Sequence, residues 1–114
     1  MVSEDQDYVE RVLAGEPEAF EALVRKYNRM AGAIAFGVLG DFHEAEDITQ
    51  EAFLKAFRVL HTLREPAKFR YWFMGLVRTK ALDAVRQRQG PRRQILSGQA
   101  LEDVGESSSF RETS

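Results

Sequence analysis

The stretch HEAEDITQEAFLKAF, residues 43–57, decides the fold class. Successive residues of a helix lie about 100° apart. With this spacing, the apolar residues of 43–60 fall on one side of the helix: Ala45, Ile48, Ala52, Phe53, Ala56, Val59 and Leu60. The opposite arc holds Asp47, Gln50, Glu51, Leu54 and Arg58. Asp41 followed by Glu44 is a capping pattern. We therefore expect a helix over about 42–60, with the apolar arc in the core.

The outward arc of this helix has Leu54 at its centre, among carboxylates. A single exposed leucine is common, so a solvated face is one interpretation. The other is a docking face, in which the leucine anchors a basic partner helix and the acidic rim sets its register. The residues alone leave both open.

Metal binding and catalysis are poorer interpretations of the same acids. His43, Glu44 and Asp47 lie close together, but hard cations need more converging oxygens, and zinc needs more His or Cys. No nucleophile setting or phosphate-binding glycine loop is present. We expect no metal, no cofactor and no enzymatic activity.

The other segments also follow a helical period. Ser3 and Gly15 bracket a first helix, and Pro17 and Gly40 bracket a second. After a connector containing Pro66, a fourth helix is expected over about 67–89, stopped by Gly90 and the proline that follows. Residues 1–90 are thus predicted to form an all-α, compact bundle of about four helices. Residues 91–114, rich in Ser and acids, are predicted to be a linker or disordered tail.

The fourth helix, FRYWFMGLVRTKALDAVRQRQ (69–89), also has two arcs. Its expected core arc comprises Phe73, Met74, Val77, Ala81, Ala84 and Val85. Its opposite arc comprises Trp72, Leu76, Thr79, Asp83 and Arg86, flanked by Arg78 and Lys80. Rings interleaved with cations suit single-stranded nucleic acid. Packing of Trp72 on another helix, or insertion of the helix into a duplex groove, are the alternatives.

Charge is strongly segregated, although the net charge of the 114 residues is only −2. Residues 1–60 carry 6 Lys and Arg against 12 Asp and Glu, whereas residues 61–93 carry 9 against 2. The basic block predicts a polyanion surface. With no cysteine, disulfides and thiolate metal sites are excluded. Neither a transmembrane run nor a signal-peptide pattern is present, so we expect one cytoplasmic domain without membrane insertion.

Two of these stretches, AEDITQEAFLKAF and FRYWFMGLVRTKALDAVRQRQ, resemble bacterial RNA polymerase sigma factors of the extracytoplasmic-function (ECF) group. They are similar to the core-binding helix and to the helix that reads and melts the promoter −10 element. EAFEALVRKY (18–27) is similar to the family's first conserved helix. The resemblance covers about residues 8–90. It implies a region 2 domain that binds core RNA polymerase and opens promoter DNA in transcription initiation.

The resemblance also implies partners and site residues. The surface for the β′ coiled coil of core polymerase would comprise Asp47, Gln50, Glu51, Leu54 and Arg58. The surface for the non-template single strand of the −10 element would comprise Leu63, Arg64, Lys68, Arg70, Tyr71, Trp72, Arg78, Thr79, Lys80 and Arg86. Residues 63–68 would form the loop that captures a flipped base. An anti-sigma factor is a further expected partner.

Two positions depart from the family's pattern. Thr79 stands where the family usually has Asn, and Thr cannot make bidentate contacts to a base edge. Gly75 stands where the family usually has a larger residue. These departures concern the recognised base rather than the overall role, and they keep an alternative function open: a sigma-like protein-interaction domain that is anti-sigma-bound or regulatory and does not melt promoters. The family's second domain, which reads the −35 element, is not in this sequence, so we expect the chain to be a fragment of a longer sigma factor.

Overall fold

The computed structural model describes residues 2–88. Four α-helices lie in this range: α1 (Glu4–Leu13), α2 (Phe20–Leu39), α3 (Phe42–Arg58) and α4 (Phe69–Arg88). Three short 3-10 helices connect them: η1 (Pro17–Ala19), η2 (Leu60–Thr62) and η3 (Pro66–Lys68). No residue of 2–88 is in a strand, so the all-α prediction is confirmed. The predicted stop at Gly90 and the predicted tail over 91–114 lie outside the described residues.

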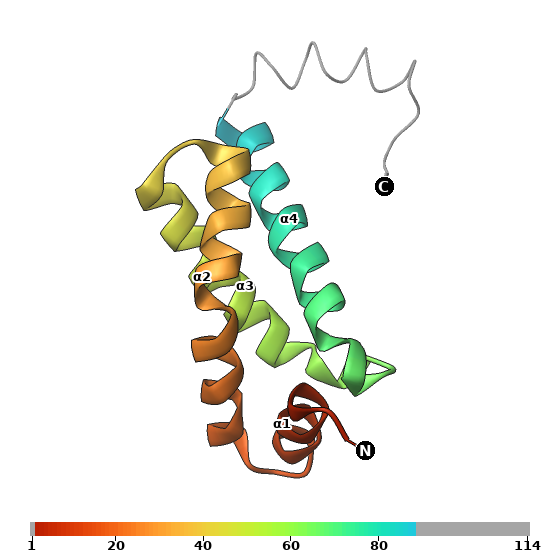
Figure 1. The fold of residues 1–114 in the computed structure, drawn as a ribbon. Helices are drawn as coiled ribbons and strands as arrows, with labels where there is room; N and C mark the ends of the chain where they lie inside the picture. The colour runs from red at the N-terminus through yellow and green to blue at the C-terminus, as the bar shows by residue number, and fades with distance from the viewer. Residues whose placement is uncertain (1, 89–114) are drawn as a thin grey trace, which may run out of the picture. The chain divides into compact units, whose positions relative to one another are not determined.

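The chain divides into two units, residues 1–84 and 85–114. The first unit contains α1, α2, α3 and most of α4 (Figure 1). Of the second, the structure describes only residues 85–88, the last turn of α4. No helix of the described range is both long and apolar enough to span a bilayer.

Helix ends follow the capping residues in the sequence. The Ser3 hydroxyl accepts from the backbone N–H of Gln6, and the Asp41 carboxylate accepts from that of Glu44 at 2.9 Å. Such caps satisfy N–H groups that have no partner inside the helix. Gly40 ends α2 with a φ of 71°, a left-handed conformation that glycine adopts without strain. The predicted starts of α1 and α3 are therefore confirmed.

Three predicted boundaries were wrong by a few residues. Pro17 begins the separate turn η1, and α2 starts at Phe20. Helix α3 ends at Arg58, and residues 60–62 tighten into η2. Pro66 likewise begins η3, so α4 starts at Phe69. Short 3-10 turns are frequent at helix ends, and a proline that lacks an N–H is well placed in their first turn.

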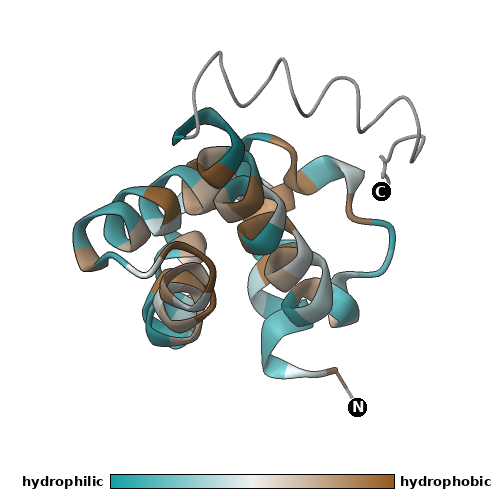
Figure 2. Cartoon of the chain, turned by 90° about the horizontal axis from the view of Figure 1, so that it is seen from above, coloured by the Kyte–Doolittle hydropathy of each residue, from teal (hydrophilic) through white to brown (hydrophobic). Residues whose placement is uncertain are grey.

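An aromatic cluster joins the helices of the first unit. The rings of Phe53 on α3 and Phe73 on α4 stack with centroids 4.5 Å apart, and Phe69 stacks on Phe73 at 5.5 Å. Phe20 and Tyr27 bring α2 into the same cluster through edge and tilted contacts with Phe69. Figure 2 shows hydrophobic and hydrophilic positions along the same helices. This core sets the directions in which the outward faces of α3 and α4 point.

The predicted core arcs are largely confirmed, with a few corrections. Ala45, Ile48, Ala52, Phe53, Ala56 and Leu60 are buried, but Val59 is only half-buried. Thr49, which the arc omitted, is buried and donates its hydroxyl to the Ala45 carbonyl at 2.8 Å. In α4, Phe69, Phe73, Val77 and Ala81 are buried, whereas Met74, Ala84 and Val85 are half-buried.

Candidate docking face and candidate nucleic-acid interface

The outward arc of α3 is accessible as predicted from its angles. Asp47, Gln50, Glu51, Leu54 and Arg58 are all exposed. The Leu54 side chain has 58% of its surface exposed, although leucine gains free energy on burial. Within residues 2–88, the structure has no ion pair to Asp47 or Glu51. On this arc, the Leu54 side chain and the unpaired carboxylates of Asp47 and Glu51 are therefore accessible to a binding partner.

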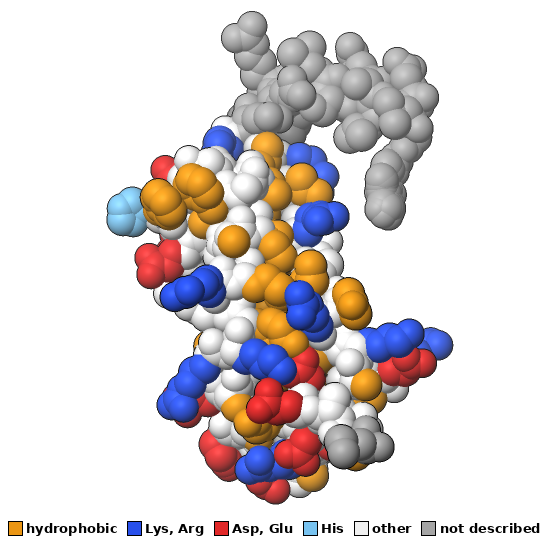
Figure 3. Space-filling model, in the orientation of Figure 1, with side chains coloured by type: hydrophobic (Ala, Val, Ile, Leu, Met, Phe, Trp, Pro, Cys, Tyr) orange, Lys and Arg blue, Asp and Glu red, His pale blue; other side chains and the backbone are white. Residues whose placement is uncertain are grey.

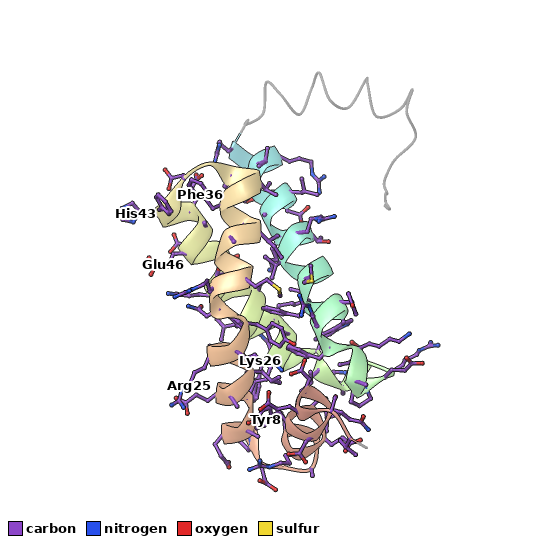
Figure 4. All side chains as sticks on the ribbon, viewed as in Figure 1. Tyr8, Arg25, Lys26, Phe36, His43 and Glu46 are labelled. Carbon is purple, nitrogen blue, oxygen red and sulfur yellow. The ribbon has the colours of Figure 1, made fainter. Side chains whose placement is uncertain are left out.

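A groove between α2 and α3 adjoins this arc. It has a volume of about 800 Å³ and shares Gln50 with the arc. At one end Phe36 and Phe42 stack with ring centroids 4.3 Å apart, and 77% of Phe42 is exposed. Figure 4 labels Phe36, His43 and Glu46 at this end of the two helices. The sequence analysis missed this stacked pair. The two phenylalanines on either side of the Gly40 turn could have indicated it.

The aromatic and basic residues at the start of α4 differ in accessibility. Tyr71 is 73% exposed, and Arg70 is exposed beside it. Trp72 is half-buried and tilts against Phe69 with ring centroids 5.8 Å apart. The indole therefore packs on the core edge and still reaches the surface, which is compatible with packing and with contact to a nucleic acid alike.

Farther along α4, Arg78 and Thr79 are exposed and Lys80 is half-buried. Arg86 is exposed in the last turn, within the second unit. Hydrophobic side chains run along the face between α2 and α4 with Lys and Arg beside them (Figure 3). Helix α4 therefore presents cations and rings on its accessible side.

The connector before α4 has one buried residue. Leu63 is 8% exposed, so it anchors the connector in the core and its side chain is not available for contact. Arg64 and Lys68 are exposed, and Lys68 pairs with Glu65 at 3.2 Å. Exposed pairs of this kind contribute little to stability. Lys68 can therefore exchange Glu65 for a phosphate at small cost.

A second groove lies between the end of α3 and the middle of α4. Its volume is about 460 Å³. Trp72, Thr79 and Lys80 line it, as do Lys55 of α3 and Thr62 of η2. The α4 residues were predicted to lie on one face. Lys55 and Thr62 were missed, because nothing in their local sequence brings them to α4.

A buried carboxylate ties α1 to α2. Asp5 is 8% exposed; it accepts from the Tyr27 hydroxyl and pairs with Lys26 Nζ at 2.7 Å. Lys26 Nζ also contacts Glu4 at 3.0 Å. The hydrogen bond to Asp5 raises the pKa of Lys26 above its usual range. Burial, followed by the hydrogen bond to Asp5, raises the pKa of Tyr27 to about 12. Since α1 packs against η2 and η3, this network also supports the connector.

We expect Tyr27→Phe to lower the free energy of unfolding by about 1–3 kcal/mol, because it leaves Asp5 without its buried donor. The raised pKa of Tyr27 gives the effect a pH dependence. The stabilisation is complete below pH 10 and is lost as pH rises through about 12, because only the unfolded state releases the proton in that window. Urea unfolding at pH 7, 10 and 12 measures both.

The matched control for this prediction is Tyr8→Phe, because no side-chain hydrogen bond of Tyr8 was found within residues 2–88. It should leave stability nearly unchanged. Equal stability of Tyr27→Phe and the wild-type chain at pH 7 would contradict a stabilising role for the Asp5 network.

The acids do not assemble into a metal site in the part of the chain that is described. Within residues 2–88 no cluster of three or more His, Asp or Glu could hold a metal ion. His43 is exposed at the start of α3. The candidate sites of residues 2–88 are therefore the exposed faces of α3 and α4 and the two open grooves.

Comparison with known families identifies part of the chain. The model for sigma-70 region 2 matches residues 23–90, more than half of the 114 residues. The match includes the outward arc of α3, the connector and α4, whereas α1 lies before it. No solved structure is significantly similar to the chain.

Similar curated proteins include three sigma factors. The chain is 41% identical to RNA polymerase sigma-H factor of Pseudomonas aeruginosa over 60% of its own length and 36% of that protein. It is 30% identical to the ECF RNA polymerase sigma factor SigW of Bacillus subtilis over 71% and 43% of the two chains. It is 33% identical to the ECF RNA polymerase sigma-E factor of Haemophilus influenzae over 89% and 54%. The chain thus spans about half or less of these relatives.

Proposed function

The chain belongs to the sigma-70 region 2 family, and we propose that it binds core RNA polymerase and recognises and melts the promoter −10 element during transcription initiation. This role belongs to the cytoplasm, where polymerase and promoter meet, and it requires no catalytic group or cofactor. The observation that carries the proposal is that two faces of different chemistry, on α3 and on α4, are both accessible on one core.

The α3 face suits a basic helical partner, for which we propose the β′ coiled coil. Leu54 would enter an apolar gap of that partner and lose its exposed area to water, which favours binding. Asp47 and Glu51 have no ion-pair partner within residues 2–88, so pairing with partner cations breaks no existing contact. Charges at such a rim mainly raise the rate of encounter and set register. Gln50 and Arg58 would border this contact.

The α4 face suits the non-template single strand of the −10 element. Separating and unstacking bases costs a few kcal/mol per base step. Stacking on an aromatic side chain returns about 1–3 kcal/mol per base. Tyr71 and Trp72 are the accessible rings of this face. Arg70, Arg78 and Lys80 would neutralise phosphates, which makes binding depend on salt.

Recognition of particular bases would use short polar groups. The Thr79 hydroxyl is exposed and can donate or accept, but it lacks an amide that could bind a base edge in bidentate fashion. Arg64 and Lys68 of the connector would hold the backbone beside a captured base. Leu63, being buried, would act only by holding the connector in place.

The experiment for this function selects DNA with the assembled complex. The chain and core polymerase are incubated with duplexes carrying a randomised ten-nucleotide single-stranded window, and bound DNA is sequenced. We expect the complex to enrich a short motif that core polymerase alone does not enrich. The alternative, a protein-interaction domain that is anti-sigma-bound or regulatory, predicts binding to core or to a partner protein without any enriched motif.

A further inference from the structure

Helix α1 lies before residues 23–90, which the family model matches, and the proposed function gives it no role. It nevertheless meets the part of the domain that is proposed to face DNA, because it packs against η2 and η3 of the connector. We propose that α1 positions the connector and the first turn of α4 for single-stranded DNA, with Asp5 as the positioning residue. This role rests on the proposed function and concerns how the DNA face is held in place.

Asp5 is the only charged side chain that is buried within residues 2–88. Burying a carboxylate is costly unless it is paired and hydrogen-bonded. The Tyr27 hydroxyl donates to one of its oxygens, and Lys26 Nζ donates to the other at 2.7 Å. Both partners lie on α2, and any shift of α1 would leave the carboxylate without them. The pairing therefore fixes α1 in one place, with the fully buried Val9 one turn farther along the same face.

Tyr27 extends this connection to α4. Its ring tilts against those of Phe69 and Phe73, with centroids 5.7 Å and 6.4 Å away. Phe69 is fully buried and begins α4 directly after η3. Burial and then the hydrogen bond to Asp5 raise the pKa of Tyr27, whereas the positive charge of Arg70 acts to lower it. The Arg70 guanidinium, a proposed phosphate contact, therefore lies within electrostatic range of the hydroxyl that Asp5 holds.

The position of the connector matters because a strand binds more tightly to groups that are already in place than to groups that must first be ordered. Arg64, Lys68 and Arg70 are exposed and would contact the strand. The buried Leu63 and Phe69 anchor the chain on either side of η3. Helix α1 packs against η3 between these two anchors, so it restricts the path of the segment that carries the proposed contacts.

The test breaks the connection with Tyr27→Phe, which keeps the ring against Phe69 and removes only the hydroxyl. Amide hydrogen exchange of the 114-residue chain reports on the connector through the N–H groups of Leu63 and Lys68, which both donate backbone hydrogen bonds inside it. A dye-labelled single strand of random sequence, added to the complex with core polymerase, reports DNA binding by anisotropy. We expect about 10-fold faster exchange at the two connector amides and about 10-fold weaker DNA binding, with core binding unchanged.

Two further variants separate positioning from general stability. Ala35 is fully buried in α2, about two turns beyond Tyr27, and glycine lowers helix stability. Ala35→Gly should therefore lower the melting temperature as Tyr27→Phe does, yet leave connector exchange and DNA affinity unchanged. Asp5→Asn keeps an oxygen that can accept from the Tyr27 hydroxyl, so it should retain most of the DNA affinity that Tyr27→Phe loses. A purely structural role would instead make DNA affinity follow the melting temperature in all three variants.

A measurement on the wild-type chain needs no variant. If α1 holds the connector, the amides of both should become exposed in the same local opening as urea is raised below the unfolding transition. Connector amides that stay protected after those of α1 have exchanged would overturn the proposal. Equal DNA affinity of Tyr27→Phe and Ala35→Gly at matched melting temperatures would overturn it too.

Failure of the proposed function gives a different result. A wild-type complex that binds the single strand no better than core polymerase alone would contradict the DNA face, and the positioning role with it. In the results that overturn only the positioning role, the wild-type complex still binds the strand, and the DNA face stands without help from α1.

Discussion

Replacing Leu54 with Arg is expected to abolish binding to core RNA polymerase while the fold stays intact. The side chain is 58% exposed and lies outside the core, so its loss costs little folding free energy. In the proposed complex it is the apolar anchor, and the new guanidinium would face a basic partner. Loss of an anchor residue typically weakens binding by more than 2 kcal/mol, and we expect a loss of about 100-fold or more. A pull-down with core polymerase and a thermal melt measure the two effects separately.

Leu13→Arg is the matched control, because Leu13 is 47% exposed at the end of α1, away from the proposed docking face. It introduces the same side chain and should leave core binding unchanged. Asp47→Arg should weaken binding as strongly as Leu54→Arg, with part of the loss in the association rate. If Leu54→Arg and Asp47→Arg both bound core polymerase with wild-type affinity, the docking-face proposal would be wrong. The outward arc would then be an ordinary solvated face.

The second large effect is expected from removing the aromatic and basic groups of α4 together. The double variant Trp72→Ala with Lys80→Ala should bind single-stranded −10 DNA about 10- to 100-fold less tightly. Loss of one stacking ring accounts for most of this. Loss of one phosphate contact should also reduce the slope of log affinity against log salt by about 0.7. Anisotropy titrations of the polymerase complex at several salt concentrations measure both.

Two further variants separate binding from stability in that experiment. Trp72→Leu keeps apolar bulk against Phe69 but removes the flat ring, so it should lose affinity with little loss of folding stability. Arg25→Ala removes a cation from α2, where it pairs with Glu21 at 3.3 Å, and it should leave the salt slope unchanged. An unchanged affinity of the double variant Trp72→Ala with Lys80→Ala at every salt concentration would contradict the proposed DNA face.

Exposure along α3 could be predicted from its sequence because a helix has a fixed angular period. Once the capping Asp41 set the start, the angle of each residue followed. Leu54 was therefore placed outward and Phe53 inward, as the structure has them. The same reasoning was less accurate for α4. Trp72 was placed opposite the core arc, but its neighbour Phe69 starts the helix inside the aromatic cluster and covers part of the indole.

The connector shows a second limit of the pattern. Leu63 was predicted as part of a DNA-facing loop, and its 8% exposure instead places it in the core. Short 3-10 turns on either side, η2 and η3, redirect the chain here. Helical periodicity carries no information about the direction of side chains in such turns, since each has its own geometry. The buried Asp5 was missed for a related reason, because its partners Lys26 and Tyr27 lie more than twenty residues away.

The sequence by itself determined the helices, their caps, the arcs of α3 and α4, and the family resemblance, because these depend on residues within one or two helical turns of one another. Only the tertiary structure decided which faces meet. It brought Lys55 and Thr62 to Trp72 and Gly75, and so formed the groove between α3 and α4. It also joined α1 to α2 through a buried carboxylate. Such contacts follow from how the aromatic core packs, and packing depends on side chains distant in sequence that no local pattern relates.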